Sequence, residues 1–202
     1  MRTIAHCLAV IALAGGLVGC GLAIQPPPPQ TKYLLQIAPE SQAKLESVCF
    51  RVRPVAVRSP FSGAGLVYRS SPVAYERDHY NQFLTPPDQQ IGEALSEWLA
   101  KVLCAEPVGL EDTQRRTLEP HLEALYGDFR DPDAPSAYAR LRFVISAYDP
   151  SCRCSRILLN ESFEATAALE PKPSAEEVVQ AMSQAINAAL DQFYTSLEEL
   201  FL

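Results

Sequence analysis

The last third of the chain constrains the fold more than any other part, because it alternates between apolar and polar residues. Over residues 136–148, apolar side chains occupy every second position: Ala137, Ala139, Leu141, Phe143 and Ile145. This period is typical of a strand with one buried face. Residues 149–156 predict a turn and residues 157–169 a second strand, so residues 136–169 predict a β-hairpin.

A long amphipathic helix follows the hairpin. Ser174 and Glu177 have the spacing of a capping box, in which each side chain satisfies a backbone amide at the start of a helix. Apolar residues then recur on one helical face: Val178, Val179, Met182, Ile186, Leu190, Phe193, Leu197 and Leu200. Because such a stripe is typical of a helix packed on a core, we expect Ile186 and Phe193 to face the sheet.

The first part of the chain predicts shorter strands and one more helix. The strand-like segments are residues 33–37, 47–58, 66–69, 73–83 and 118–126. Thr85, Pro86 and Asp88 suit the first turn of a helix. Its apolar stripe is Ile91, Leu95, Trp98 and Val102. Pro107 ends the helical pattern.

Together these elements predict a single α+β domain over residues 32–202. We expect an antiparallel β-sheet with two main α-helices packed on one face. No internal repeat and no second linker divides this region. Hydrophobic residues make up 48% of the 202 residues, which is enough for a packed core.

Residues 1–19 predict a signal peptide. Arg2 precedes an apolar stretch over residues 4–17, which is too short to span a bilayer stably. The tripeptide Leu-Val-Gly then precedes Cys20, the lipobox pattern of bacterial lipoproteins, in which the cysteine thiol carries lipid after cleavage. An ordinary signal peptide that happens to contain a cysteine is the alternative.

Residues 20–31 predict a lipidated cysteine and a Pro-rich tether. Residues 26–29 are all proline, and an extended segment rising ~3.1 Å per residue would hold the domain about 30 Å from the membrane. Gly21, rather than an aspartate, follows Cys20, and in enteric bacteria this favours the outer membrane. We therefore expect an outer-membrane protein, anchored by lipid, whose domain faces the periplasm.

The charge balance and the histidines argue against nucleic-acid binding and against catalysis. Lys and Arg total 17 against 24 Asp and Glu, a net charge of −7, whereas phosphate backbones require a basic surface. His79 and His121 belong to no catalytic or metal-binding motif. The aspartates of residues 128–133 do not fit a calcium loop and predict a solvated turn. We therefore expect no enzyme activity, no cofactor and no metal.

Four cysteines remain beyond the signal peptide and Cys20: Cys49, Cys104, Cys152 and Cys154. An exported protein meets an oxidising compartment, so we expect at least one disulfide among the three possible pairings. A bond between Cys152 and Cys154 would close a small strained ring. We favour Cys49 with Cys104, because Cys49 lies on a predicted strand and Cys104 near the end of the helix beside it. Unpaired thiols are the alternative.

Most of the chain resembles the ABC-type transport auxiliary lipoprotein family. The resemblance rests on patterns of apolar and aromatic residues at positions 52–57, 66–69, 75–83, 86–99, 125–130 and 138–146, and on the lipobox. It covers nearly all of residues 33–200. Many members carry an Arg-Trp pair where this chain has Gln82 and Phe83, a departure that would weaken a partner contact assigned there.

The resemblance implies a non-enzymatic component of an MCE (mammalian-cell-entry) transport system, which moves lipids between the inner and outer membranes. The lipoprotein would dock the periplasmic MCE-domain protein at the outer membrane. The candidate docking residues are the aromatics of one hairpin: Tyr68, Tyr75, Tyr80 and Phe83. Aromatics are enriched at interfaces, but the same residues also fit a core.

Two other function classes stay open. A periplasmic lipid-binding chaperone would need an apolar cavity between the helices and the sheet. A structural envelope lipoprotein would need neither a cavity nor a transport partner. Self-association into a homo-oligomer is also open.

Overall fold

The computed structural model describes residues 29–38, 50–102 and 116–201. The elements, in chain order, are β1 (Thr31–Tyr33), β2 (Phe50–Val52), β3 (Ala56–Val57), the 3₁₀ turn η2 (Ser59–Phe61), β4 (Gly65–Arg69), β5 (Tyr75–Phe83), α2 (Pro87–Val102), β6 (Arg116–Asp128), β7 (Ser136–Asp149), β8 (Cys154–Ala168) and α3 (Ala175–Phe201). The predicted signal peptide, Cys20, Cys49 and Cys104 lie outside the described residues. Within the described residues, no helix is long and apolar enough to cross a membrane.

The strands form one sheet of eight strands within the described part of the chain, in the order β1-β5-β4-β6-β7-β8, with β2 and β3 also paired to β6. The sheet is mixed rather than strictly antiparallel, which differs in this detail from the predicted antiparallel sheet. β6, β7 and β8 are antiparallel neighbours, but β2, β3 and β4 run parallel to β6, and β1 runs parallel to β5. The reason is that α2 carries the chain back to the end of the sheet where β2 begins, so β6 starts beside β2 and runs the same way.

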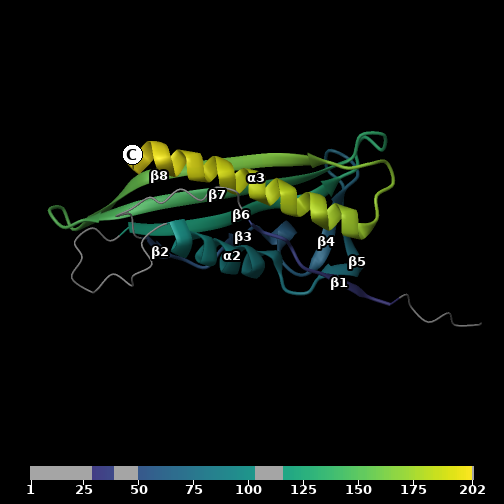
Figure 1. Ribbon diagram of the computed structural model, residues 1–202, viewed down its shortest axis with the longest axis horizontal. Helices are drawn as coiled ribbons and strands as arrows, with labels where there is room; N and C mark the ends of the chain where they lie inside the picture. Colours follow the sequence, from purple (N-terminus) through teal and green to yellow (C-terminus); the bar gives the residue numbers. More distant parts are fainter. Residues whose placement is uncertain (1–28, 39–49, 103–115, 202) are drawn as a thin grey trace, which may run out of the picture.

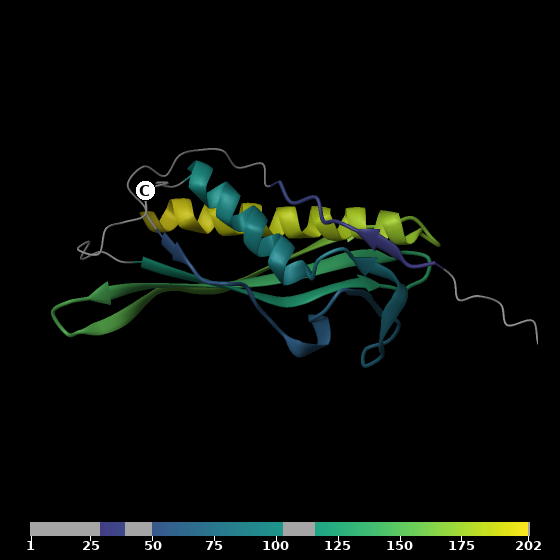
Figure 2. The same cartoon turned by 90° about the horizontal axis from the view of Figure 1, so that it is seen from below.

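Both helices lie on one face of the sheet, as predicted, and the α+β fold class is confirmed (Figures 1 and 2). The core fills the layer between helices and sheet. It combines Ile91 and Leu95 of α2 with Phe143 of β7 and with Ile186 and Phe193 of α3, all of them fully buried. The predicted inward faces of Ile186 and Phe193 are therefore confirmed.

Local sequence signals account for how the long elements begin and end. At the start of α3, Ser174 Oγ accepts a hydrogen bond from the Glu177 amide (3.2 Å), and the Glu177 carboxylate accepts one from the Ser174 amide (2.6 Å). This is the capping box that the sequence predicts. Pro54 splits the predicted strand over residues 47–58 into β2 and β3, because a proline has no amide proton for the ladder.

Residues 34–38 leave the predicted strand pattern and cross over the two helices instead. Their backbone amides are satisfied by side chains. The Leu35 amide donates to Gln90 Oε1 of α2 (2.7 Å), and the Gln36 amide donates to Ser183 Oγ of α3 (3.0 Å). Gln90 and Ser183 are buried, and binding these amides is what allows two polar side chains into the helix layer. The chain end nearest the tether is thereby fixed to both helices.

Candidate functional site

The four aromatic residues singled out in the sequence do not form one surface. Phe83 is 3% exposed and belongs to the core under the helices. Tyr68 is half-buried on the same side, where its ring lies edge-on to Phe129 at 5.6 Å and its hydroxyl contacts Asp78 at 3.4 Å. Burial, and secondarily the Asp78 charge, raise the pKa of Tyr68. For these two residues the core interpretation is the right one. Tyr68 points to the opposite side of the sheet from its neighbour Arg69, and the irregular register between β4 and β5 turns Phe83 to the helix side.

Tyr75 and Tyr80 are exposed, with 44% and 46% of their surfaces accessible. Tyr75 lies on the sheet face that carries no helix, where it belongs to a group of four rings that we call the aromatic cluster: Phe61, Tyr75, Tyr126 and Tyr138. The Tyr75 and Tyr126 rings meet edge to face at 5.6 Å, and the Tyr126 and Tyr138 rings stack at 5.0 Å. Of the four predicted docking residues, Tyr75 therefore belongs to a larger aromatic surface.

Three strands and one turn assemble the aromatic cluster. Tyr126 of β6 and Tyr138 of β7 are direct partners in the antiparallel register, and η2 brings Phe61 within 6.0 Å of Tyr126. The sequence contained one signal of this surface. Tyr138 falls between Ala137 and Ala139 in the alternating strand, so its ring must point away from the core.

Arg69 joins the aromatic cluster from β4. Its guanidinium carbon lies 5.5 Å from the Tyr75 ring centre and 5.7 Å from that of Tyr126, and its Nη1 donates a hydrogen bond to the Tyr126 hydroxyl (3.2 Å). Burial is the main reason that the pKa of Tyr126 is raised, while Arg69 opposes the rise. The result is a partly exposed surface of stacked rings around a positive charge.

A polar network continues from the aromatic cluster along the same sheet face, centred on Glu123. A bulge between Leu122 and Ala124 inserts Glu123 into β6 as an extra residue. Its carboxylate, only 7% exposed, accepts hydrogen bonds from Arg58 (3.0 Å) and Ser162 (3.1 Å) and forms an ion pair with Arg140 (3.0 Å). β3, β6, β7 and β8 are thus tied together across this face.

Tyr138 links the aromatic cluster to the polar network. Its hydroxyl donates to the Glu164 carboxylate of β8. Burial first, and then this hydrogen bond and the Glu164 charge, raise the pKa of Tyr138 to about 12. Tyr138 therefore stays protonated, as a hydrogen-bond donor, throughout the neutral range.

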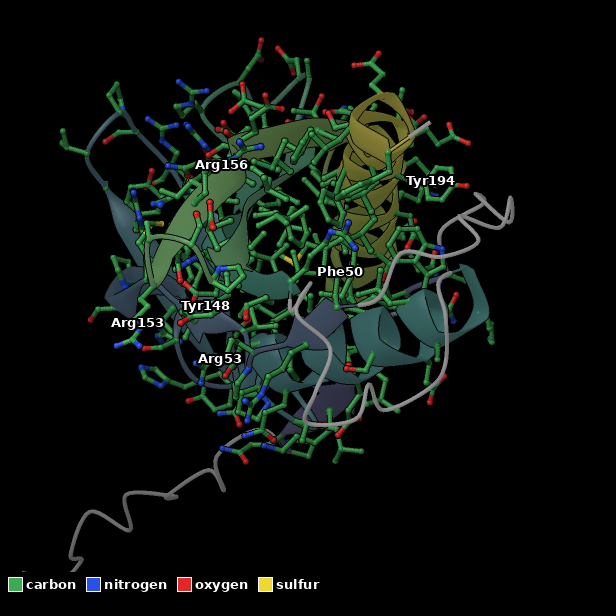
Figure 3. All side chains as sticks on the ribbon, turned by 90° about the vertical axis from the view of Figure 1, so that its left-hand side faces the viewer. Phe50, Arg53, Tyr148, Arg153, Arg156 and Tyr194 are labelled. Atoms are coloured by element: carbon green, nitrogen blue, oxygen red, sulfur yellow. A yellow bond between two sulfur atoms is a disulfide. The ribbon has the colours of Figure 1, made fainter. Side chains whose placement is uncertain are left out.

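A second region of interest lies at the end of the molecule farthest from β1, where the β7–β8 hairpin turns (Figure 1). An open groove of about 570 Å³ there lies between the hairpin and the last turn of α3, lined by Arg116, Ala147, Tyr148, Asp149, Pro150, Arg156, Leu158, Leu200 and Phe201. Figure 3 looks onto this end, with Tyr148, Arg153 and Arg156 contributed by the hairpin and Arg53 by the segment after β2.

The same hairpin carries the disulfide that the structure describes. Cys152 and Cys154 are bonded, with their sulfurs 2.11 Å apart. This is the pairing that the ring-size argument disfavoured, and the hairpin turn makes it because it brings the two Cα atoms to 5.3 Å. The pairing of Cys49 with Cys104 lies outside the described residues and stays a prediction. Because Cys152 and Cys154 are bonded to each other, Cys49 with Cys104 is the pairing that remains among the four cysteines.

Residues that suggested other chemistry have structural roles where they are described. Arg130 forms a hydrogen-bonded ion pair with Asp128 (2.7 Å) and thereby lowers its pKa. The Asp133 amide donates to Asp131 in the same turn. Within residues 29–38, 50–102 and 116–201, no group of three His, Cys, Asp or Glu side chains is arranged to hold a metal ion.

Comparison with known proteins gives a fold likeness. No family model matches the chain, and no curated protein matches it by sequence. Protein XCC0632 from Xanthomonas campestris, of family DUF330, is similar to it with a TM-score of 0.62 at 13% identity, over 84% of this chain and 98% of that one. A crystal structure of an uncharacterized protein is similar with a TM-score of 0.57 at 20% identity, over 85% of this chain and 99% of that one. At these identities the likeness shows the fold alone.

Proposed function

We propose that this protein is an outer-membrane lipoprotein that docks the periplasmic MCE-domain protein of an ABC-type intermembrane lipid transport system. The sequence resemblance over residues 33–200 and the predicted lipid anchor at Cys20 support this role. The fold, shared along nearly the full length of a DUF330 protein, is consistent with a small auxiliary protein.

The observation that carries the proposal is the aromatic cluster on the uncovered face of the sheet. Tyrosine and arginine are enriched among the residues that dominate binding energy at protein interfaces. Here Tyr75 is exposed and packs edge-on against Tyr126, while Arg69 lies over both rings. Rings held by their neighbours lose little conformational freedom on binding, which favours a docking surface.

The placement of the chain end supports this arrangement. Thr31 begins β1 at one end of the sheet, and the C-terminal end of α3 lies at the other (Figure 1). A tether that leaves from the β1 end allows the long sheet to extend away from the membrane. Its uncovered face would then be accessible to a partner in the periplasm.

The lipid-binding chaperone that the sequence left open finds less support. Such a protein would need space between the helices and the sheet. That layer is filled by side chains such as Phe143, Met182, Ile186 and Phe193, each 0% exposed. The experiment must distinguish the docking role from that of a purely structural envelope lipoprotein.

The test is a pull-down from detergent-solubilised membranes, with the captured proteins identified by mass spectrometry. Tyr75→Asp should reduce recovery of the MCE-domain protein, while Tyr148→Asp should not. The two tyrosines are a matched pair, being 44% and 45% exposed at opposite ends of the molecule. Thermal unfolding of each variant provides the control for folding.

Three results would count against the docking role or against its assignment to the aromatic cluster. Failure of the wild type to capture an MCE-domain protein would remove the docking role and favour a structural lipoprotein. Equal capture by wild type and Tyr75→Asp would place the interface elsewhere, for example on the Arg51 and Arg53 face. Loss of folding in Tyr75→Asp would make Arg69→Gln the deciding variant, and undiminished capture by that variant would exclude the aromatic cluster.

A further inference from the structure

The Cys152–Cys154 disulfide lies at the tip of the β7–β8 hairpin, which projects beyond the end of α3 (Figures 1 and 2). Cys152, Arg153 and Cys154 are all exposed. Asp149 and Cys154 form the last residue pair of the two-strand register. A reactant in solution therefore reaches the bond without any opening of the core.

The bond adds little to the stability of the fold. A disulfide stabilises mainly by restricting the unfolded chain, and the effect grows with the length of the loop it closes. Here the sequence separation is 2, among the shortest that a disulfide can have. The strands beside it are already paired along their whole length, from Ser136 with Ala168 to Asp149 with Cys154. Opening the bond should leave the domain folded.

The residue inside the ring holds an unfavourable backbone conformation. Arg153 has φ of 52°, in the left-handed region that is disfavoured for any residue with a Cβ. The short ring and the hairpin turn hold it there. The ring restrains Arg153 in addition to the hairpin turn, so opening the disulfide removes one of the two restraints on this unfavourable conformation.

The electrostatic environment of a thiolate differs between Cys152 and Cys154. Cys152 Sγ lies 3.7 Å from the carbonyl oxygen of Asp149, whose partial negative charge disfavours a thiolate at that sulfur. Arg153 is adjacent to both cysteines, whereas Arg156 lies two residues from Cys154 and four from Cys152, so Cys154 has the larger share of positive charge in sequence. Neighbouring positive charge stabilises a thiolate and makes it a better leaving group. Asp149 pairs with Cys154 across the hairpin, and its carboxylate accepts hydrogen bonds from the Ser151 amide and hydroxyl.

We propose that the Cys152–Cys154 disulfide undergoes thiol–disulfide exchange with anionic low-molecular-weight thiols while the domain stays folded. The incoming thiolate attacks Cys152 Sγ and forms a mixed disulfide, and the Cys152–Cys154 bond breaks with its electron pair leaving on Cys154 as a thiolate. A second thiol molecule, as thiolate, attacks the small-molecule sulfur of the adduct, and the bond to Cys152 breaks with its electron pair leaving on Cys152 as a thiolate. The products are the reduced cysteine pair and the oxidised disulfide of the small thiol, so two thiols are oxidised for each protein disulfide reduced.

The arginines also select the thiol. Arg153 and Arg156 favour a reactant that carries carboxylates, such as glutathione, over a neutral thiol of similar reactivity. Tyr148, Asp149, Pro150 and Arg156 line the groove beside the tip, so an adduct on Cys152 would lie at the mouth of that groove. The exchange chemistry is independent of the docking role proposed above.

The experiment incubates the oxidised, detergent-solubilised full-length protein with glutathione, quenches with acid, alkylates free thiols and digests with trypsin. Because trypsin cleaves after Arg153, the two cysteines fall in separate peptides, and mass spectrometry reads them independently. We expect the glutathione adduct on the peptide of Cys152 and the alkylated thiol on Cys154. Circular dichroism of the reacted protein should match that of the untreated protein.

Variants separate the physical causes. Arg153→Gly relieves the left-handed conformation and removes one charge, and it should slow exchange roughly tenfold. Arg156→Gln removes only charge and should slow exchange with glutathione more than exchange with neutral 2-mercaptoethanol. Arg142→Gln, on β7 away from the tip, is the control and should leave both rates unchanged.

Three outcomes overturn the proposal. The bond could open only in denaturant, which would make it a structural disulfide. An alkylating reagent could modify both cysteines of the exported protein without prior reduction, which would show that the two cysteines are not bonded. The adduct could appear on Cys154 alone, with rates that are indifferent to Arg153 and Arg156, which would refute the assigned direction of attack and its electrostatic cause.

Discussion

The ring of Phe193 on α3 lies parallel to the ring of Phe143 on β7, with centroids 3.8 Å apart and planes 11° from parallel. Both rings are 0% exposed. Phe163 of β8 packs against the pair, at 6.1 Å from Phe143 and 5.7 Å from Phe193. This contact joins the C-terminal helix to the middle of the hairpin on which it lies, and it fixes the position of α3 along the sheet.

Phe193→Ala should lower the free energy of unfolding by about 3–5 kcal/mol, because it leaves a cavity between two layers that cannot collapse around it. Chemical denaturation followed by circular dichroism measures the change. Glu199→Ala on the exposed side of the same helix is the matched control and should change little. A loss under 1 kcal/mol for Phe193→Ala would contradict the central position of the ring pair.

Glu123→Gln should destabilise the domain by about 1–3 kcal/mol, because the buried Glu123 side chain loses the charge that pairs it with the partly exposed Arg58 and Arg140. Glu119→Gln, an exposed position on the same strand, should be nearly neutral. A double-mutant cycle with Arg140→Gln measures the coupling directly. Additive effects of the two substitutions would mean that the pair contributes nothing to stability.

The stability of the domain should fall between pH 10 and pH 12. The pKa of Tyr138 is raised in the folded state from 10.0 to about 12, so the unfolded chain releases this proton first as the pH rises. The contribution is therefore fully present below pH 10 and is lost as the pH approaches 12. Tyr138→Phe should make this decline shallower. Glu164→Gln should lower the pKa of Tyr138 only in part, because burial is the larger cause.

Thermal unfolding across this pH range, with tyrosinate absorbance as the second observable, measures both effects. The pKa values of Tyr68 and Tyr126 are raised as well, so some decline should remain in Tyr138→Phe. An identical decline in wild type and Tyr138→Phe would show that Tyr138 ionises alike in the folded and unfolded states.

Cys20→Ser should abolish lipid labelling and release the domain into the soluble periplasmic fraction, because the thiol that carries the lipid is gone. Cys7→Ser, within the predicted signal peptide, is the matched control and should leave the protein in the membrane. Fractionation with a carbonate wash and radiolabelled fatty acid provides the measurement. Membrane retention of Cys20→Ser would contradict the lipid anchor.

The candidate surface was reached from the sequence only in part. Tyr75 and Phe83 are both aromatic residues on one predicted strand, so the sequence predicts the same role for both. Tyr75 belongs to the aromatic cluster, whereas Phe83 is buried. Composition of one strand cannot tell the two apart, because the face to which a side chain points depends on the register, on the bulge between Gly65 and Val67, and on what covers each face.

Features encoded between near neighbours follow from the amino-acid sequence alone. The capping box of Ser174 and Glu177, the stripe of α3 and the alternation of β7 each depend on residues a few positions apart, and each is present as predicted. The single α+β domain with both helices on one face follows, because two amphipathic stripes and one apolar sheet face must be buried together.

Which distant segments become neighbours depends on the folded arrangement of the whole chain. Phe50 pairs with Arg116 in parallel, and Phe61 lies over Tyr126, although neither pair is linked by any local period. The bulge that places Glu123 between Arg58 and Arg140 is equally invisible in the alternation of β6. Such contacts are selected by the total burial and hydrogen bonding of the whole sheet, and that sum exists only once the chain has folded.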